Sequence, residues 1–165
     1  MRNTYQYPTA TRWLFYSICA YFIMNGAQLW ETAIMVPAWT AAPPSSFIFF
    51  QKPYMLDFKM FWIIIHGIHE SVFITAVIFN WAIKNRRKLM LLVLVAHIAV
   101  RIWTLTYFAP VITEFQQLPY SDTLDISLQE KAARWRNLNY LRVVIFFALN
   151  FLLIHGLKIK EKNNE

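Results

Sequence analysis

The sequence predicts an all-α integral membrane protein, a bundle of four transmembrane helices. Of its 165 residues, 58% are hydrophobic and only 15% are charged, which is too little charge to coat the surface of a soluble domain. Aromatic residues make up 18%, a share typical of membrane spans and their interfaces. Four apolar stretches are close to or longer than the ~20 residues that cross a bilayer. They predict spans over about 13–36, 58–83, 89–108 and 139–157.

Helices are expected because only helices and closed barrels satisfy the backbone within lipid, and barrel strands would be half as long and alternating. We expect one domain over 1–165, with longer outer connections at about 37–57 and 111–136. The first connection is rich in proline and aromatic residues, so it should not be a simple helix and should lie at the membrane interface. In the second, Ser127 and Glu130 form an S-x-x-E pattern, which predicts the start of the last helix.

The basic residues predict the orientation of the chain in the membrane. Three clusters fall on the same side of a four-span protein, so this side and both termini should face the cytoplasm. We expect a bacterial-type inner membrane. The clusters lie at 84–88, at Lys158, Lys160 and Lys162, and at Arg2 and Arg12.

Charge distribution and cysteine content argue against two classes of protein. The net charge is +7, but the basic residues follow apolar stretches and do not interleave with exposed aromatics, so we expect no nucleic-acid binding. The chain has one cysteine, Cys19, so it forms neither an internal disulfide nor a CxxC redox pair. Membrane reductases that work through paired thiols are therefore disfavoured.

Polar residues inside the predicted spans are the candidates for function, because a charge near the bilayer centre costs roughly 3 kcal/mol or more. In the second span His66, His69 and Glu70 share one helical face, and the third span carries His97, Arg101 and Thr104. Helical rise places the polar residues in the outer half of the bundle, where we expect one pocket for a small molecule. An ion-paired network that only fixes helix packing is the alternative. The other predicted pocket residues are Asn25, Gln28, Glu31, Trp62, Trp135, Asn139 and Arg142.

Three motifs occur among these residues. The first is Asn25-Gly-Ala-Gln-Leu-Trp-Glu31, followed by Pro37; the second runs from Arg101 to Pro110; the third is W-x-x-L-N-x-x-R at 135–142. Together they resemble the anthrone oxygenase-like family of small four-helix membrane proteins. The resemblance implies oxidation of a polycyclic anthrone to an anthraquinone with O₂, without a bound metal or flavin.

The first hypothesis for function is therefore an oxidoreductase of the oxygenase type that acts on a small hydrophobic, aromatic molecule. A histidine of the second span, His69 or His66, would deprotonate a carbon acid, with Glu70 orienting it. Arginine side chains would hold the resulting oxyanion. The predicted catalytic residues are His66, His69, Glu70, His97 and Arg101, and Thr104 and Arg142 join the residues that bind substrate.

Two further hypotheses stay open. No cofactor is predicted, but His66, His69, Glu70 and His97 are also plausible ligands for a haem or a transition metal. The other hypothesis is a non-enzymatic small-molecule binding protein or an accessory subunit of a membrane complex. The chain lacks the GxxxG pair that favours helix docking, which weakens the subunit alternative. The expected partners are a hydrophobic small molecule and the lipid bilayer, with a homo-oligomer as a further alternative.

Overall fold

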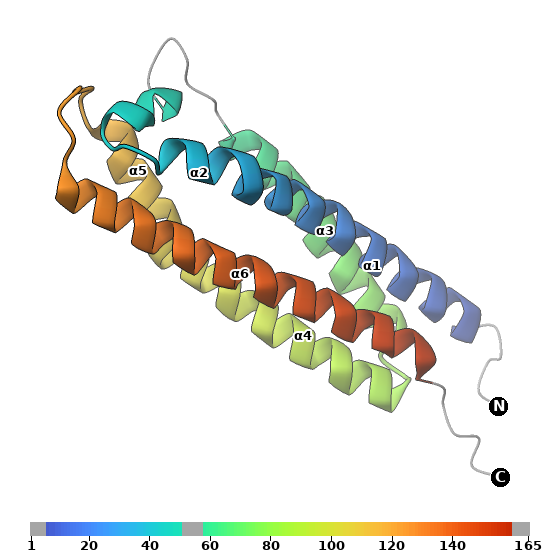
Figure 1. Ribbon diagram of the computed structural model, residues 1–165. Coiled ribbons are helices and arrows are strands. Elements are labelled where there is room, and N and C mark those ends of the chain that lie inside the picture. The colour runs from blue at the N-terminus through green and yellow to red at the C-terminus, as the bar shows by residue number, and fades with distance from the viewer. Residues whose placement is uncertain (1–5, 51–57, 160–165) are drawn as a thin grey trace. The chain divides into compact units, whose positions relative to one another are not determined.

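The computed structural model describes residues 6–50 and 58–159, and the described residues form helices and turns without a strand. The long helices are α1 (Gln6–Trp30), α3 (Lys59–Phe79), α4 (Lys84–Trp103) and α6 (Ile126–Lys158), as Figure 1 shows. The all-α prediction is thus confirmed for this part of the chain. Of the predicted basic clusters, Arg2, Lys160 and Lys162 lie outside the described residues.

Within residues 6–50 and 58–159, three helical segments are long and apolar enough to cross a membrane, namely Lys59–Phe79, Lys84–Gln117 and Ile126–Lys158. Their exposed surface is apolar: Ile64, Ile78 and Val95 are among many large hydrophobic side chains that are more than half exposed. Exposed apolar area on this scale suits a lipid environment and not water. The chain is accordingly an integral membrane protein.

The first predicted span differs from the other three. Helix α1 is 25 residues long, but tyrosine, tryptophan, asparagine and glutamine residues are scattered through it, and it is not one of the three segments above. The predicted stretch at 13–36 also does not end as a regular helix. α1 ends at Trp30, and a π-helical turn and the short α2 (Val36–Trp39) follow.

Contacts divide the chain into two compact units, and each is described by itself. Unit 1 consists of Met1–Asn25, Trp62–Ile98 and Phe146–Glu165. Unit 2 consists of Gly26–Phe61 and Ala99–Ile145.

Arg86 stabilises unit 1, although the sequence predicts it in the basic loop at 84–88 between the second and third spans. The connection is in fact the turn at 80–83, because α4 already begins at Lys84. The Arg86 side chain is only 1% exposed. Its guanidinium donates hydrogen bonds to the Ile159 carbonyl at 3.0 Å and to side-chain oxygens nearby. These acceptors are the Thr11 hydroxyl, the Asn80 amide oxygen and the Tyr7 hydroxyl.

Two π-helical turns interrupt the helices of unit 2. One spans Glu31–Met35 and precedes α2, and the other spans Thr104–Phe108 and precedes α5 (Ala109–Gln117). Each lies just before a proline, Pro37 or Pro110, at the second position of the helix that follows. Since proline lacks an N–H and its ring crowds the preceding turn, the helix widens there without ending. The two turns place Glu31 and Thr104 at irregular backbone.

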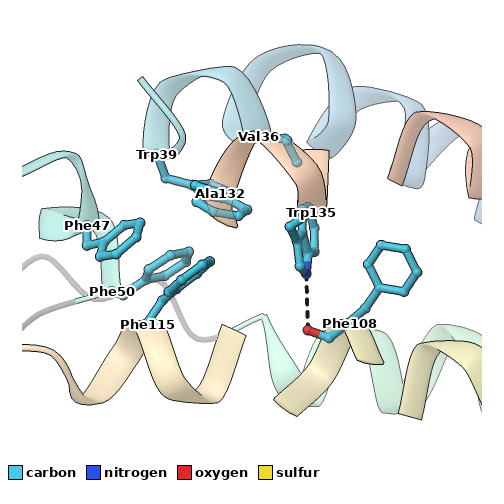
Figure 2. Close-up of a cluster of buried hydrophobic side chains, with 8 residues drawn as sticks. All are labelled: Val36, Trp39, Phe47, Phe50, Phe108, Phe115, Ala132 and Trp135. Atoms are coloured by element: carbon cyan, nitrogen blue, oxygen red, sulfur yellow. Dashed lines mark hydrogen bonds between the residues drawn. The ribbon is translucent and has the colours of Figure 1, made fainter. Parts of the chain in front are cut away.

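An aromatic core stabilises unit 2 and includes aromatic side chains of the first predicted connection. Trp39 and the 3₁₀ helix η2 (Ser45–Phe50) pack against α5 and α6, and the Trp135 indole N–H donates to the Phe108 carbonyl at 3.2 Å (Figure 2). The aromatics of this connection that belong to the core are buried, not exposed. The core consists of Val36, Trp39, Phe47, Phe50, Phe108, Phe115, Ala132 and Trp135. Positions 51–57 of the connection lie outside the described residues.

The second predicted connection is mostly helical. α5 reaches Gln117 and α6 begins at Ile126, so the non-helical part is only 118–125. The cap of α6 is Asp125 and not the predicted Ser127. The Asp125 carboxylate accepts a hydrogen bond from the Leu128 N–H at 3.0 Å and another from the Ser127 hydroxyl at 2.7 Å. An acidic residue at this position also suits the positive end of the helix dipole.

Candidate functional site

The first group of polar residues lies in unit 1 and is called the histidine group: Tyr21, His69, Glu70 and His97. The Tyr21 hydroxyl lies 2.6 Å from Nδ1 of His97, a short hydrogen bond between buried side chains of α1 and α4. On the other edge of the same imidazole, Nε2 lies 3.7 Å from the Glu70 carboxylate of α3. His97 therefore connects a phenol to a carboxylate.

Aromatic packing holds these side chains in place. The Tyr21 ring meets His69 edge to face with centroids 4.2 Å apart, and His69 lies 5.1 Å from the His97 ring. Phe73 stacks on His69, and Phe146 packs against His97 at 5.4 Å. Because the rings wedge one another, His97 has little freedom to turn away from Tyr21.

The side chains of the histidine group become less exposed from Glu70 to His97 to Tyr21. The Glu70 side chain is 39% exposed, His97 is 3% exposed, and Tyr21 is fully buried. A carboxylate beside Nε2 favours a proton on that nitrogen, which leaves Nδ1 to accept from the Tyr21 hydroxyl. The three groups thus run from the surface of unit 1 to its interior.

The second group lies in unit 2 and is called the arginine group: Thr32, Thr104, Asn139 and Arg142. Arg142 donates to the Asn139 amide oxygen at 2.6 Å and to the Thr104 hydroxyl at 3.3 Å. The Asn139 amide nitrogen in turn donates to Thr32 at 2.9 Å. The Phe108 ring lies 4.3 Å from the guanidinium carbon, in the geometry of a cation–π contact. The guanidinium is therefore held in one orientation.

Two further charges act on the arginine group. The Glu31 carboxylate attracts Arg142, and the Arg101 guanidinium repels it. Glu31 and Thr104 each begin a π-helical turn, and such turns are frequent at functional sites because they shift side chains out of the regular helical pattern. The group can hold an oxyanion through a fixed, charged donor.

No protein-family model, curated protein or solved structure matches this chain. The resemblance to the anthrone oxygenase-like family therefore stays a prediction.

The predicted site residues fall into the two units. In unit 1, Asn25 is buried and donates to the Phe146 carbonyl at 3.3 Å, and Trp62 packs its ring on His66. In unit 2, Gln28 is buried. The sequence assigned Glu70 to orient a histidine of its own helix, and the structure places the Glu70 carboxylate 3.7 Å from Nε2 of His97 on α4. The predicted residues thus lie as follows: Asn25, Trp62, His66, His69, Glu70 and His97 in unit 1, and Gln28, Glu31, Arg101, Thr104, Trp135, Asn139 and Arg142 in unit 2.

Tyr21 is the main residue that the sequence analysis missed. A buried tyrosine in an aromatic-rich helix has no distinguishing mark of its own. Its signal is spacing, since Tyr21, Asn25 and Gln28 follow one another at i, i+4 and i+7 on one face of α1. Thr32 and Phe108 were missed for a different reason, because both lie in π-helical turns where helical periodicity fails.

The metal alternative rests on the same histidines. Among the residues that the structure describes, no three His, Cys, Asp or Glu side chains gather in a group that fits a metal ion. The His69 and His97 rings touch each other directly.

Proposed function

We propose that this protein is a membrane oxidoreductase of the oxygenase type that acts on a small hydrophobic aromatic molecule. The observation that carries the proposal is the connection from Tyr21 through His97 to Glu70. A phenol, an imidazole and a carboxylate in this order form an acid–base relay, and surrounding apolar rings make the relay suitable for an apolar substrate.

The proposed topology has four spans, with α1 as the fourth beside the three apolar segments. At about 1.5 Å per residue, a helix the length of α1 is long enough to cross the hydrocarbon core. Basic side chains at the start of α4 and the end of α6 favour cytoplasmic termini and an inner-membrane location. These side chains are Lys84, Arg87, Lys88 and Lys158.

In the proposed reaction the relay removes a proton from an activated methylene carbon of an anthrone-type substrate. His97 takes the place of His69 or His66 as the base, because it contacts both an acid and a phenol. The resulting enolate carbon forms a bond to one atom of O₂. Loss of the second C–H proton with cleavage of the O–O bond leaves a carbonyl and releases the other oxygen as water. The carbon is oxidised and O₂ is the oxidant, so no other electron acceptor is needed.

The test is oxidation of an anthrone by the purified protein in non-ionic detergent, followed as O₂ uptake and quinone absorbance. We expect His97→Gln and Tyr21→Phe to lower turnover by about 10² or more, the usual share of acid–base catalysis. His155→Gln and Tyr16→Phe are the matched controls, since these side chains are exposed. Full turnover in both relay variants would rule out this mechanism.

A haem or metal site is the second candidate, favoured by the contact between His69 and His97. An absorption spectrum and elemental analysis of the same sample decide between the two. A Soret band, or iron, copper or zinc near one per chain that falls in His97→Gln, would make the histidines ligands. A colourless, metal-free sample that oxidises anthrone supports the relay, and one that binds it without turnover supports a carrier protein.

A further inference from the structure

Basic side chains that reach the surface lie where three helix ends of unit 1 meet. Arg86, near the start of α4, donates to the Thr11 hydroxyl of α1 at 2.9 Å and to the Ile159 carbonyl just after α6 at 3.0 Å. Several further cationic residues lie within two positions of these three residues and are exposed or partly exposed. We call them the basic patch: Arg12, Lys84, Arg87, Lys88 and Lys158.

Positive charge is concentrated in unit 1. This unit contains nine Lys and Arg residues and three Asp and Glu residues, so it carries +6 of the chain's net charge of +7. Among its described residues the only acidic side chain is Glu70, which lies beside His97, roughly 20 Å from Lys84 along α4. Because like charges that lie close together repel one another, a partner with negative charge is favoured at the basic patch.

The basic patch lies at the ends of membrane-spanning segments. The segment Lys84–Gln117 begins in the patch, and the segment Ile126–Lys158 ends in it. Trp81, in the turn before α4, is 52% exposed, and the guanidinium carbon of Arg87 lies 5.2 Å from the centre of its ring. Exposed tryptophans and basic side chains at the ends of spans are typical of the level of the lipid headgroups. The patch therefore lies where lipid phosphates are always present.

We propose that the basic patch binds the phosphate groups of anionic lipids. Ammonium and guanidinium groups suit phosphate oxygens, and several of them together favour negatively charged headgroups over zwitterionic ones. The proposal goes beyond the oxidoreductase function and uses no side chain of the histidine group. It also does not depend on which side of the membrane the termini face.

The experiment compares binding of phosphatidylglycerol and of phosphatidylcholine with the same acyl chains to the purified protein in non-ionic detergent. Native mass spectrometry gives the apparent Kd of the first bound lipid. We expect phosphatidylglycerol to bind at least about tenfold more tightly, because each basic side chain near a headgroup adds to the attraction. Equal affinity for the two lipids would overturn the proposal. Displacement of phosphatidylglycerol by millimolar inorganic phosphate would overturn it as well, because the site would then take a free anion.

A variant of the basic patch tests where the preference arises. In Arg12→Gln/Lys88→Gln/Lys158→Gln we expect the preference for phosphatidylglycerol to fall to about twofold or less. All three side chains are exposed, so near-UV circular dichroism should stay unchanged. A preference of wild-type size in this variant would contradict the proposal. In the wild-type protein the preference should also fall as ammonium acetate is raised, because salt screens exposed charges, and a constant preference would contradict the proposal without any variant.

The matched control removes three cations from unit 2. Lys59→Gln/Lys131→Gln/Arg134→Gln loses the same charge and should keep the preference for phosphatidylglycerol. An equal fall in both triple variants would show that net charge, and not the basic patch, selects the lipid. Since no turnover is measured, a failed anthrone assay does not bear on this result.

Discussion

The hydroxyl of Tyr21 lies 2.6 Å from Nδ1 of His97, across 76 positions of sequence. This is the shortest link in the histidine group and joins two side chains that are both buried. The Glu70 carboxylate on the far edge of the imidazole makes His97 the centre of the arrangement. The relay proposed above depends on this one contact.

The Tyr21–His97 contact should appear as an energetic coupling. We expect the double variant Tyr21→Phe/His97→Gln to be less destabilised than the sum of the two single variants, by about 1 kcal/mol. The reason is that either single change already removes the hydrogen bond. Reversible unfolding in detergent measures the cycle. The control cycle pairs His97→Gln with Tyr16→Phe, for which a coupling near zero is expected; equal coupling in both cycles would contradict the contact.

Trp135 should contribute to stability through its indole N–H as well as its rings. Trp135→Phe keeps most of the apolar area but leaves the Phe108 carbonyl without its donor, so we expect a loss of about 1–2 kcal/mol. Chemical unfolding followed by fluorescence measures it. Trp30→Phe changes an exposed residue and should cost little. A Trp135→Phe protein as stable as wild type would mean that the hydrogen bond adds nothing.

Arg86 should contribute far more to the stability of the fold than its neighbour Arg87. Arg86→Ala removes the donor of a buried acceptor, the Asn80 amide oxygen, and of three part-buried acceptors, and we expect a loss of about 3 kcal/mol or more. Arg87 lies over Trp81, a half-exposed ring, and Arg87→Ala should change stability by less than about 1 kcal/mol. Thermal unfolding of both variants provides the comparison. Equal losses would mean that Arg86 acts only through charge.

The cap of α6 predicts a dependence of stability on pH. The Ser127 hydroxyl, followed by the Leu128 N–H, lowers the pKa of the Asp125 carboxyl below its ordinary value. A lowered pKa means that the carboxylate stabilises the fold above the ordinary value and that this stabilisation is lost as the pH falls through the lowered one. Asp125→Asn keeps a capping side chain, so the melting temperature should fall slightly at neutral pH and lose part of its acid dependence. If the melting temperature of Asp125→Asn depends on acid as that of wild type does, a group other than Asp125 causes the dependence.

Residue spacing along the predicted helices indicated several of the side-chain neighbours that the structure shows. Helical spacing put His66, His69 and Glu70 on one face, and the structure brings two of these three next to His97. Spacing also placed Asn139 and Arg142 together, and they form a direct hydrogen bond. The pattern fails where the backbone departs from an α-helix. The π-helical turns shift Thr32 and Phe108 away from the positions that a period of 3.6 assigns.

The sequence by itself determined that the chain is helical and apolar enough for a membrane, because helix period and hydrocarbon thickness are both local constraints. Only the tertiary structure decided which polar groups meet. It showed Arg86 buried within α4 and not in a loop between spans, Asp125 as the cap, and Tyr21 as the partner of His97. Such pairings join residues that are distant along the chain. The sequence shows that a polar residue in an apolar helix needs a partner, but it does not show which residue that partner is. The partner is determined by how the helices pack.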